Sequence, residues 1–334
     1  MSYEPTVMRT ALARLERRRE GRKRRLFQLE RELYAEEPRL RQTDLALRGN
    51  MADLARLATG GQPVQPDGPE IAAIRARSEA LQKERTQLLA GLGYAPDALD
   101  DVPVCPRCRD TGWTQEGMCT CLKELCAQEQ LKALTALLNL TDEQDFDKLR
   151  LDIYSDRPWN GKRPPRETME RVIGACESYA RQFPDFEEKN LLLSGGTGLG
   201  KTFLSGCIAR EVSNRGYSVV YDTVGSVFGE FDTSRFSRDS ATREQARGFI
   251  RRYLNCDLLI LDDLGTEQNL PSAQASLYEL VNGRIQSGRH TILSTNLSTE
   301  DIGRRYGAQL GSRIAGLYWE LTFYGDDLRL LRNL

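Results

Sequence analysis

Ser194-Gly195-Gly196-Thr197-Gly198-Leu199-Gly200-Lys201-Thr202 is the stretch around which this sequence is organised, and it contains the pattern G-x-x-x-x-G-K-[ST]. The apolar residues 190–193 before it predict a short strand, and residues 202–212 after it predict a helix. In this setting the glycines bring backbone N–H groups to phosphate oxygens, because a Cβ would obstruct both the tight turn and the approach. The helix adds unpaired N–H groups and the positive end of its dipole. The stretch therefore predicts a phosphate-binding loop.

The loop also predicts which residues bind a nucleotide. Lys201 would reach the β- and γ-phosphates, and the hydroxyl of Thr202 would bind Mg²⁺. ATP and Mg²⁺ are therefore the expected cofactors. The alternative is a glycine-rich turn that binds nothing, and the full pattern with its flanking strand and helix favours binding. The expected nucleotide-binding residues are Gly195, Gly196, Thr197, Gly198, Leu199, Gly200, Lys201 and Thr202.

The composition is ordinary for a soluble protein. The 334 residues are 40% hydrophobic and 28% charged, which suits about two domains with a sizeable core. A net charge of −1 means that any binding of nucleic acid must come from local patches. We find neither a long apolar run nor an apolar stretch near the N-terminus, so we expect no membrane span, no secretion signal and a cytoplasmic protein.

Residues 1–100 predict a helical coiled-coil hairpin. Leu26, Leu29, Leu33 and Leu40 recur at heptad-like spacing on a long helix with a possible break near Pro38. The glycines and prolines of residues 59–69 end this helix, and a second helix begins near residue 70. Two such helices should pack antiparallel and bury little core alone, which favours a stalk or a partner-binding arm.

The first helix carries a basic cluster that has two interpretations. It could contact nucleic acid or an acidic partner, or it could be a solvated helix face. The cluster consists of Arg14, Arg17, Arg18, Arg19, Arg22, Lys23, Arg24 and Arg25.

Residues 101–135 predict a zinc-binding region. Cys105 and Cys108 form one close pair, and Cys119 and Cys121 form a second, so four thiolates could close a tetrahedral site. The reducing cytoplasm favours a metal over disulfides. Four protein ligands leave no open position, so the expected Zn²⁺ is structural. The second pair is closer than the usual C-x₂-C, so an iron–sulfur cluster or plain thiols remain alternatives.

From residue 136 to residue 334 predicted strands and helices alternate, which indicates an α/β fold with a parallel sheet covered on both faces. A mixed region precedes residue 256, and the lone histidine, His290, is expected to be structural. The predicted strands are residues 190–193, 217–221, 258–261, 291–294 and 317–323, and the predicted helices include 166–183, 201–215, 272–286 and 299–306.

Polar side chains follow two of these strands. Asp262 and Asp263 end an apolar strand, at the edge of a parallel sheet where ligands gather. Asp262 would hold Mg²⁺ directly or through water, and Asp263 would orient and activate the attacking water. Asn296 would hydrogen-bond the γ-phosphate or that water. The alternatives are a helix N-cap for the two aspartates and a turn residue for Asn296.

The three motifs, in this order and spacing, resemble Walker A, Walker B and sensor 1 of an AAA+ ATPase. The sequence Leu-Asp-Asp-Leu-Gly-Thr-Glu at 261–267, Ser-Thr-Asn-Leu-Ser at 294–298 and Ser-Arg-Ile at 312–314 is similar to the bacterial replicative-helicase loaders of the DnaC/DnaI type. The cysteine stretch is similar to the zinc region of the longer Gram-positive loader-like proteins. The expected fold is thus an AAA+ P-loop domain over residues 136–334.

The resemblance implies further roles. Arg313 matches the arginine finger, which reaches the γ-phosphate in a neighbouring subunit, so hydrolysis would require assembly. Arg304 and Arg305 are fallback candidates, or charges at a helix C-terminus. Arg329, in a Gly-x-Asp-x-Arg ending, corresponds to a sensor 2-like contact with the nucleotide. Asp263 stands where AAA+ proteins usually have Glu, which implies slow hydrolysis suited to a switch.

The stretch 224–253 alternates arginines with phenylalanines. The resemblance implies a helical insertion that lines the pore of a spiral and touches single-stranded DNA, and the alternative is an amphipathic helix with its aromatics in the core. The expected function is therefore an ATP-dependent loader of the replicative DNA helicase. Its partners would be that hexameric helicase, single-stranded DNA and further copies of itself. A transposition helper ATPase of the IstB type and a non-catalytic ATP-binding adaptor remain alternatives.

Overall fold

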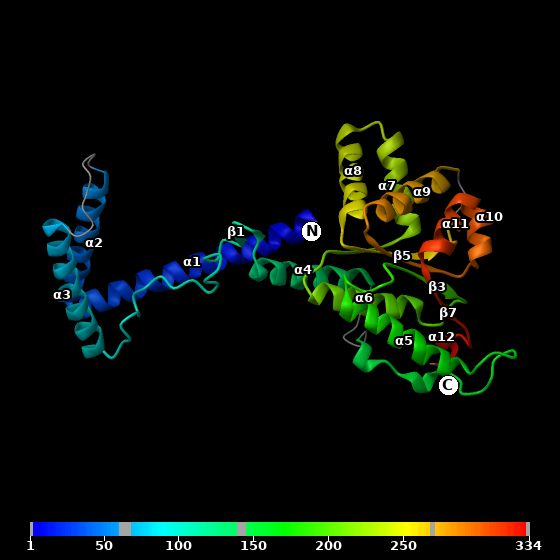
Figure 1. The fold of residues 1–334 in the computed structure, drawn as a ribbon, viewed down its shortest axis with the longest axis horizontal. Coiled ribbons are helices and arrows are strands. Elements are labelled where there is room, and N and C mark those ends of the chain that lie inside the picture. The colour runs from blue at the N-terminus through cyan, green and yellow to red at the C-terminus, as the bar shows by residue number, and fades with distance from the viewer. Residues whose placement is uncertain (1–2, 60–67, 139–144, 268–270, 332–334) are drawn as a thin grey trace. The chain divides into compact units, whose positions relative to one another are not determined.

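The computed structural model describes residues 3–59, 68–138, 145–267 and 271–331. The chain divides into two units, Met1–Leu12 with Gly117–Leu334 and, separately, Ala13–Glu116 (Figure 1). Within the described ranges, no helix is long and apolar enough to cross a membrane. Most of the turn predicted at residues 59–69 lies outside the described residues.

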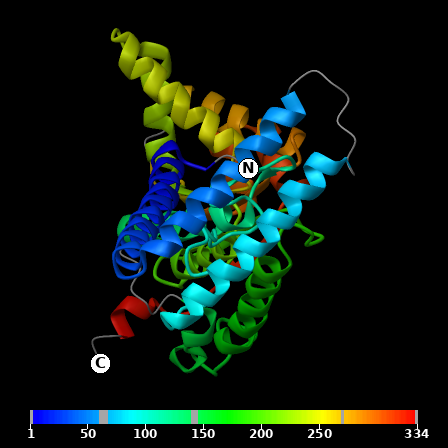
Figure 2. The same ribbon diagram turned by 90° about the vertical axis from the view of Figure 1, so that its left-hand side faces the viewer.

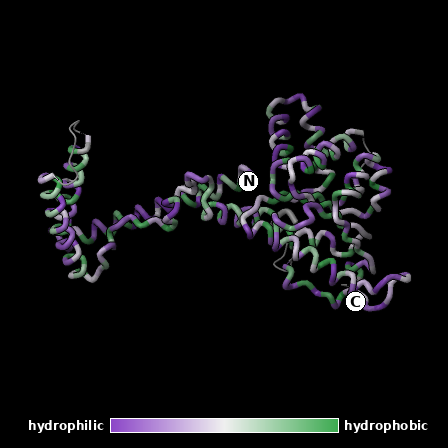
Figure 3. The backbone as a smooth tube through the Cα atoms, viewed as in Figure 1, coloured by the Kyte–Doolittle hydropathy of each residue, from purple (hydrophilic) through white to green (hydrophobic). Residues whose placement is uncertain are grey.

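The smaller unit contains most of α1 (Pro5–Glu36), together with α2 (Pro38–Thr59) and α3 (Pro69–Gly91). All three helices begin with proline, which suits a first turn because its missing N–H is not needed there. The predicted break at Pro38 is confirmed. The antiparallel pair consists of α2 and α3, which lie side by side (Figure 2). The chain changes direction at Pro38, and α1 contacts the pair through Leu33, which shares a small core with Leu40 and Leu89. Figure 3 shows that hydrophilic residues predominate along α1.

The larger unit is built on a parallel sheet, as predicted. Five strands lie in the order β4-β5-β6-β3-β7, and every neighbouring pair is parallel. The inner strands are buried almost throughout, which is typical of a sheet covered on both faces. The strands are β3 (Asn190–Gly195), β4 (Val219–Thr223), β5 (Leu258–Leu264), β6 (His290–Thr295) and β7 (Trp319–Phe323).

Alternate residues of the strands pack into two hydrophobic cores. Leu191 and Leu193 belong to the core that contains residues of α4, α5 and α6, whereas Leu192 belongs to the core that contains residues of α7 to α11. The helices are α4 (Thr120–Leu138), α5 (Pro165–Gln182), α6 (Lys201–Asn214), α7 (Val224–Phe236), α8 (Ser240–Asn255), α9 (Pro271–Gln286), α10 (Thr299–Tyr306), α11 (Ala308–Leu317) and α12 (Leu328–Leu331), with short 3₁₀ turns η1 (Phe146–Lys148) and η2 (Leu151–Ile153).

Two predicted segments differ from the structure. The mixed region before residue 256 forms two helices, α7 and α8. The last strand begins at Trp319, because Leu317 ends the additional helix α11. That helix buries Leu310 and Ile314, which are four residues apart and therefore lie on one face.

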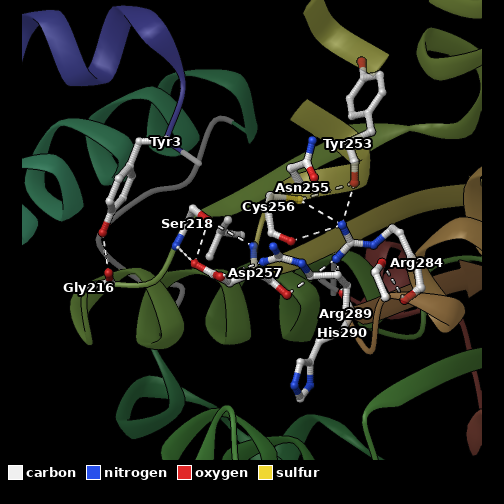
Figure 4. Close-up of polar contacts among 12 residues, drawn as sticks. Tyr3, Gly216, Ser218, Tyr253, Asn255, Cys256, Asp257, Arg284, Arg289 and His290 are labelled. Atoms are coloured by element: carbon white, nitrogen blue, oxygen red, sulfur yellow. Dashed lines mark hydrogen bonds and ion pairs between the residues drawn. The ribbon is translucent and has the colours of Figure 1, made fainter. Parts of the chain in front are cut away.

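A buried arginine fixes the edge of the sheet opposite the predicted site (Figure 4). The side chain of Arg284 is fully buried, and its guanidinium donates to the carbonyl oxygens of Tyr253, at 2.5 Å, and His290, at 2.5 Å. It also donates to the carbonyl oxygen of Cys256 at 3.1 Å and to Thr291 Oγ1 at 3.0 Å. Arg284 therefore binds the end of α8 to the start of β6.

Candidate nucleotide-binding site

The phosphate-binding loop connects the end of β3 to the start of α6, at the carboxyl edge of the sheet. Gly195, Gly198 and Gly200 have φ angles of 146°, 71° and 98°, a region that favours glycine. A Cβ on Gly195 would collide with the carbonyl oxygen of Phe323, and one on Gly198 would collide with the carboxylate of Asp327. The loop therefore requires glycine both for its turns and for its contacts with the C-terminal segment.

Lys201 is held by the loop itself. Its Nζ donates to the carbonyl oxygens of Gly195, at 2.8 Å, and Gly196, at 2.6 Å. The side chain is buried, and burial lowers the pKa of Lys201. The Lys201 ammonium group thus donates to two carbonyl oxygens of the loop, and phosphate oxygens of a bound nucleotide could replace them as acceptors.

The two aspartates at the end of β5 occupy different environments. Asp262 is buried and accepts a hydrogen bond from the Tyr221 hydroxyl at 2.6 Å, and a second from the hydroxyl of Ser294. Asp263 is exposed and has a φ of 59°, at a register shift between β5 and β6. Partial desolvation of its carboxyl group by the surrounding protein, together with the neighbouring Asp262 charge, raises the pKa of Asp263 although the residue is exposed overall.

Residues from all three predicted motifs line one cavity of about 1100 Å³, whereas Gly195, Gly196 and the buried Asp262 are not among its lining residues. Thr197 through Thr202 line it from the loop and α6, Asp263 lines it from β5, and Asn296 lines it from the end of β6. Arg329 lines it from the C-terminal segment. Cationic, carboxylate and amide groups therefore face one space, as binding of a nucleotide with a metal ion requires.

Among the described residues that line this cavity, Arg313 is absent. Arg313 lies on α11, where its guanidinium stacks 5.6 Å from the centre of the Tyr278 ring. Arg304 pairs with Glu300 and Asp301 on its own helix, and the guanidinium of Arg305 donates to the carbonyl oxygen of Glu267.

Sequence reasoning missed one wall of the cavity. This wall is largely apolar and includes Leu149, Ile153, Phe203 and Leu328. Beside it, the Tyr154 hydroxyl donates to the carbonyl oxygen of Leu199 at 3.1 Å, and Leu328 N donates to the carbonyl oxygen of Gly198 at 3.0 Å. An apolar wall beside a loop expected to bind phosphate is suitable for packing against the planar adenine base of a nucleotide. Phe203 directly follows the loop motif, whereas Leu149, Ile153 and Leu328 are far from the loop in sequence and form no motif, so only the fold identifies these three.

The four predicted zinc ligands lie close together. The Sγ atoms of Cys105, Cys108, Cys119 and Cys121 are all within 4.8 Å of one another. Zinc–sulfur bonds of about 2.3 Å in a tetrahedron place sulfur atoms about 3.8 Å apart, so this donor set fits Zn²⁺. The Asp110 carboxylate accepts hydrogen bonds from the N–H groups of Val104, at 3.0 Å, and Cys105, at 2.8 Å, and pairs with Arg22.

Strand β1 (Trp113–Thr114) and strand β2 (Gly117–Met118) pair between the two halves of the cysteine set. This short sheet turns the chain back, which explains how cysteines separated in sequence come together.

The stretch 224–253 is divided between core and surface. Phe228 and Phe231 are buried in the core beneath α7, whereas Phe236 is 72% exposed. Arg247 and Arg251 are exposed on α8, where both pair with Glu244. Phe228 and Phe231 therefore agree with the alternative of an amphipathic helix with its aromatics in the core. Phe236 is exposed at the tip of the α7–α8 hairpin.

Comparisons with known proteins match the part of the chain that contains the glycine-rich loop. Residues 180–312 match the sequence model of the IstB-like ATP binding protein family. The uncharacterized protein YdaV of Escherichia coli K12 is 28% identical over 138 residues, 39% of this chain and 54% of that protein. The replicative helicase loader DnaC of the same strain is 28% identical over 148 residues, 44% of this chain and 58% of DnaC.

The chain thus spans little more than half the length of these two relatives. A crystal structure of the DnaC helicase loader aligns with a TM-score of 0.43 at 21% identity, over 54% of this chain and 98% of that one.

Proposed function

We propose that this protein is an AAA+ ATPase of the DnaC type that loads the replicative DNA helicase, since residues 180–312 match the IstB-like ATP binding protein family and a stretch of 148 residues is 28% identical to the loader DnaC. The supporting observation is the cavity that groups Lys201, Thr202, Asp263 and Asn296 at the carboxyl edge of the sheet. DnaC, one of the similar proteins, is a replicative helicase loader.

In this proposal, ATP with Mg²⁺ supplies the phosphoryl group that is transferred to water. Lys201 exchanges its two loop carbonyls for phosphate oxygens, and Thr202 and Asp262 hold the metal ion. Asp263 orients the attacking water and accepts its proton, for which a raised pKa is favourable. Asn296 hydrogen-bonds the same water or the γ-phosphate, and Arg329 contacts the phosphates.

Arg313 serves a neighbouring copy of the chain. It lies on α11 away from its own cavity, so a guanidinium from α11 of one copy would reach the γ-phosphate bound by the next. Hydrolysis then depends on assembly, and ATP favours assembly because two copies contact its γ-phosphate in one state only.

The other parts of the chain provide the contacts with partners. The exposed Phe236 and the arginines of the α7–α8 hairpin would stack on bases and pair with phosphates of single-stranded DNA. The helical hairpin in residues 1–100 and the zinc region in residues 101–135 would bind the hexameric helicase, leaving residues 136–334 as the ATPase domain. The protein would act in the cytoplasm.

The test is ATP turnover by the purified full-length chain, with single-stranded DNA and the host replicative helicase each added or omitted. Lys201→Ala should abolish ATP binding. Arg313→Ala should retain ATP binding and lose turnover stimulated by DNA, and normal turnover in this variant would refute its role. Arg171→Ala is the matched control, since Arg171 is an exposed arginine of α5 that pairs with Glu167 of its own helix and has no role in the proposal.

The second candidate is a transposition helper ATPase, which the family match at residues 180–312 favours. Capture of the helicase by residues 1–135 of the intact protein, with turnover that depends on DNA, supports the loader. Turnover stimulated by duplex DNA, without capture of the helicase, supports the transposition helper.

A further inference from the structure

Tyr221 is a buried side chain for which the proposed mechanism has no role. It lies on β4 with 4% of its surface exposed, and its hydroxyl donates to Oδ2 of Asp262 at 2.6 Å. A buried tyrosine hydroxyl usually finds a hydrogen-bond partner. Here the partner is the carboxylate proposed to hold Mg²⁺, which is itself only 4% exposed.

The carboxylate is fixed from both neighbouring strands. β4, β5 and β6 are adjacent in the sheet, and they carry Tyr221, Asp262 and Ser294 in that order. Ser294 Oγ donates to Oδ1 of Asp262, and the backbone N–H of Asp263 donates to the same oxygen at 3.1 Å. Hydrogen bonds from two sides therefore determine how the carboxylate group is rotated.

The two carboxylate oxygens of Asp262 differ in how many further hydrogen bonds they can accept. Each can accept about two hydrogen bonds. Among the contacts described, Oδ1 receives two donors, whereas Oδ2 receives one, from Tyr221. Oδ2 is therefore the oxygen left to accept a water molecule from the hydration shell of a metal ion, and the Tyr221 hydroxyl holds that oxygen in place.

We propose that Tyr221 is a positioning residue that orients the Asp262 carboxylate toward Mg²⁺. The inference rests on the proposed binding of ATP with Mg²⁺ in this cavity. Residues that orient a metal-binding carboxylate typically change metal affinity about 10–100-fold when they are mutated. The hydroxyl of Tyr221 makes this contribution through Asp262, and its ring fills the core beside α6.

The experiment measures binding of a fluorescent ATP analogue to the full-length protein, in EDTA and during a titration with Mg²⁺. Tyr221→Phe removes the hydroxyl and keeps the ring. The affinity for the analogue in EDTA should be unchanged, whereas the Mg²⁺ concentration for half-maximal effect should rise about tenfold or more. Damage to the fold would instead weaken binding in both conditions.

Tyr253→Phe is the matched control. Tyr253 is also buried, and its hydroxyl donates to Oδ2 of Asp222, on the same strand β4, at 2.7 Å (the side chain is labelled in Figure 4). This variant loses the same type of hydrogen bond without touching Asp262, so its Mg²⁺ titration should match the wild type.

Three results would overturn the inference. Coinciding Mg²⁺ titrations of Tyr221→Phe and wild type would overturn it alone, as would an equal loss of affinity with and without Mg²⁺. Failure of the wild type to bind the analogue would overturn the proposed function as well. If Tyr221→Phe does not fold, Ser294→Ala removes one of the two donors to Oδ1 of Asp262 and tests by the same titration whether these hydrogen bonds control Mg²⁺ affinity, and an unchanged titration would count against the inference.

Discussion

The single histidine should make the stability of this protein depend on pH in a defined window. His290 begins β6 and is buried, with its ring centre 4.5 Å from that of Phe183 and its Nδ1 3.4 Å from the Tyr179 hydroxyl. Burial, together with the positive charges of Lys189 and Arg284, lowers the pKa of His290 from 6.5 to about 4. The perturbation is a change of pH from 7 to 5, where the imidazole would be protonated in an unfolded chain but not in the folded one.

The sign and size follow from linkage between protonation and folding. Because the folded pKa lies below the unfolded one, the unfolded chain binds the proton first as the pH falls, so stability is lost on acidification. The full contribution is present above pH 6.5 and is lost as the pH falls toward 4. A difference of roughly 2.5 pKa units corresponds to about 3.4 kcal/mol, of which about 2 kcal/mol is lost between pH 7 and pH 5.

The assay is direct because the chain contains one histidine, which gives a single imidazole signal in a proton NMR titration. The titration should show a midpoint near 4, and urea unfolding of the wild type should become easier between pH 7 and pH 5. His290→Gln, which does not titrate in this range, should lose less stability over the same interval. An NMR midpoint near 6.5 with the protein folded would refute the reasoning.

Three further predictions follow from contacts described above. Gly198→Ala should weaken ATP binding about tenfold in a fluorescence titration, because a Cβ at this positive φ costs about 1–2 kcal/mol and also meets Asp327; Asp327→Ala in the same chain should restore part of the affinity. Arg284→Ala should lower the free energy of unfolding in urea by about 3 kcal/mol or more, since it leaves several buried carbonyl groups without a donor; a change below about 1 kcal/mol would contradict this. The purified protein should contain about one zinc ion per chain by elemental analysis, and Cys108→Ala should lose it; a full complement of zinc in that variant would exclude Cys108 as a ligand.

Much of the fold could be predicted from local patterns. The apolar strand before Asp262, the glycine-rich loop and the alternation of strands and helices predicted a parallel sheet, and that prediction is confirmed. The proline at residue 38 marked the end of α1. Helix α11 was missed because its short apolar pattern, Leu310 and Ile314, lies close to that of the strand that follows it.

Some features of the candidate site could also be predicted from local sequence, and others could not. The sequence by itself determined which residues form the glycine-rich loop and the polar ends of β5 and β6, and it predicted their role in phosphate binding, because each motif depends on neighbours within a few positions of the chain. Only the tertiary structure revealed the apolar wall with Ile153, the hydrogen bond from Tyr221 to Asp262 and the carbonyl contacts of Arg284. These contacts join residues that are far apart in sequence, and the order of the strands brings them together. No local periodicity carries that information, because it arises when buried polar groups find partners across the packed sheet.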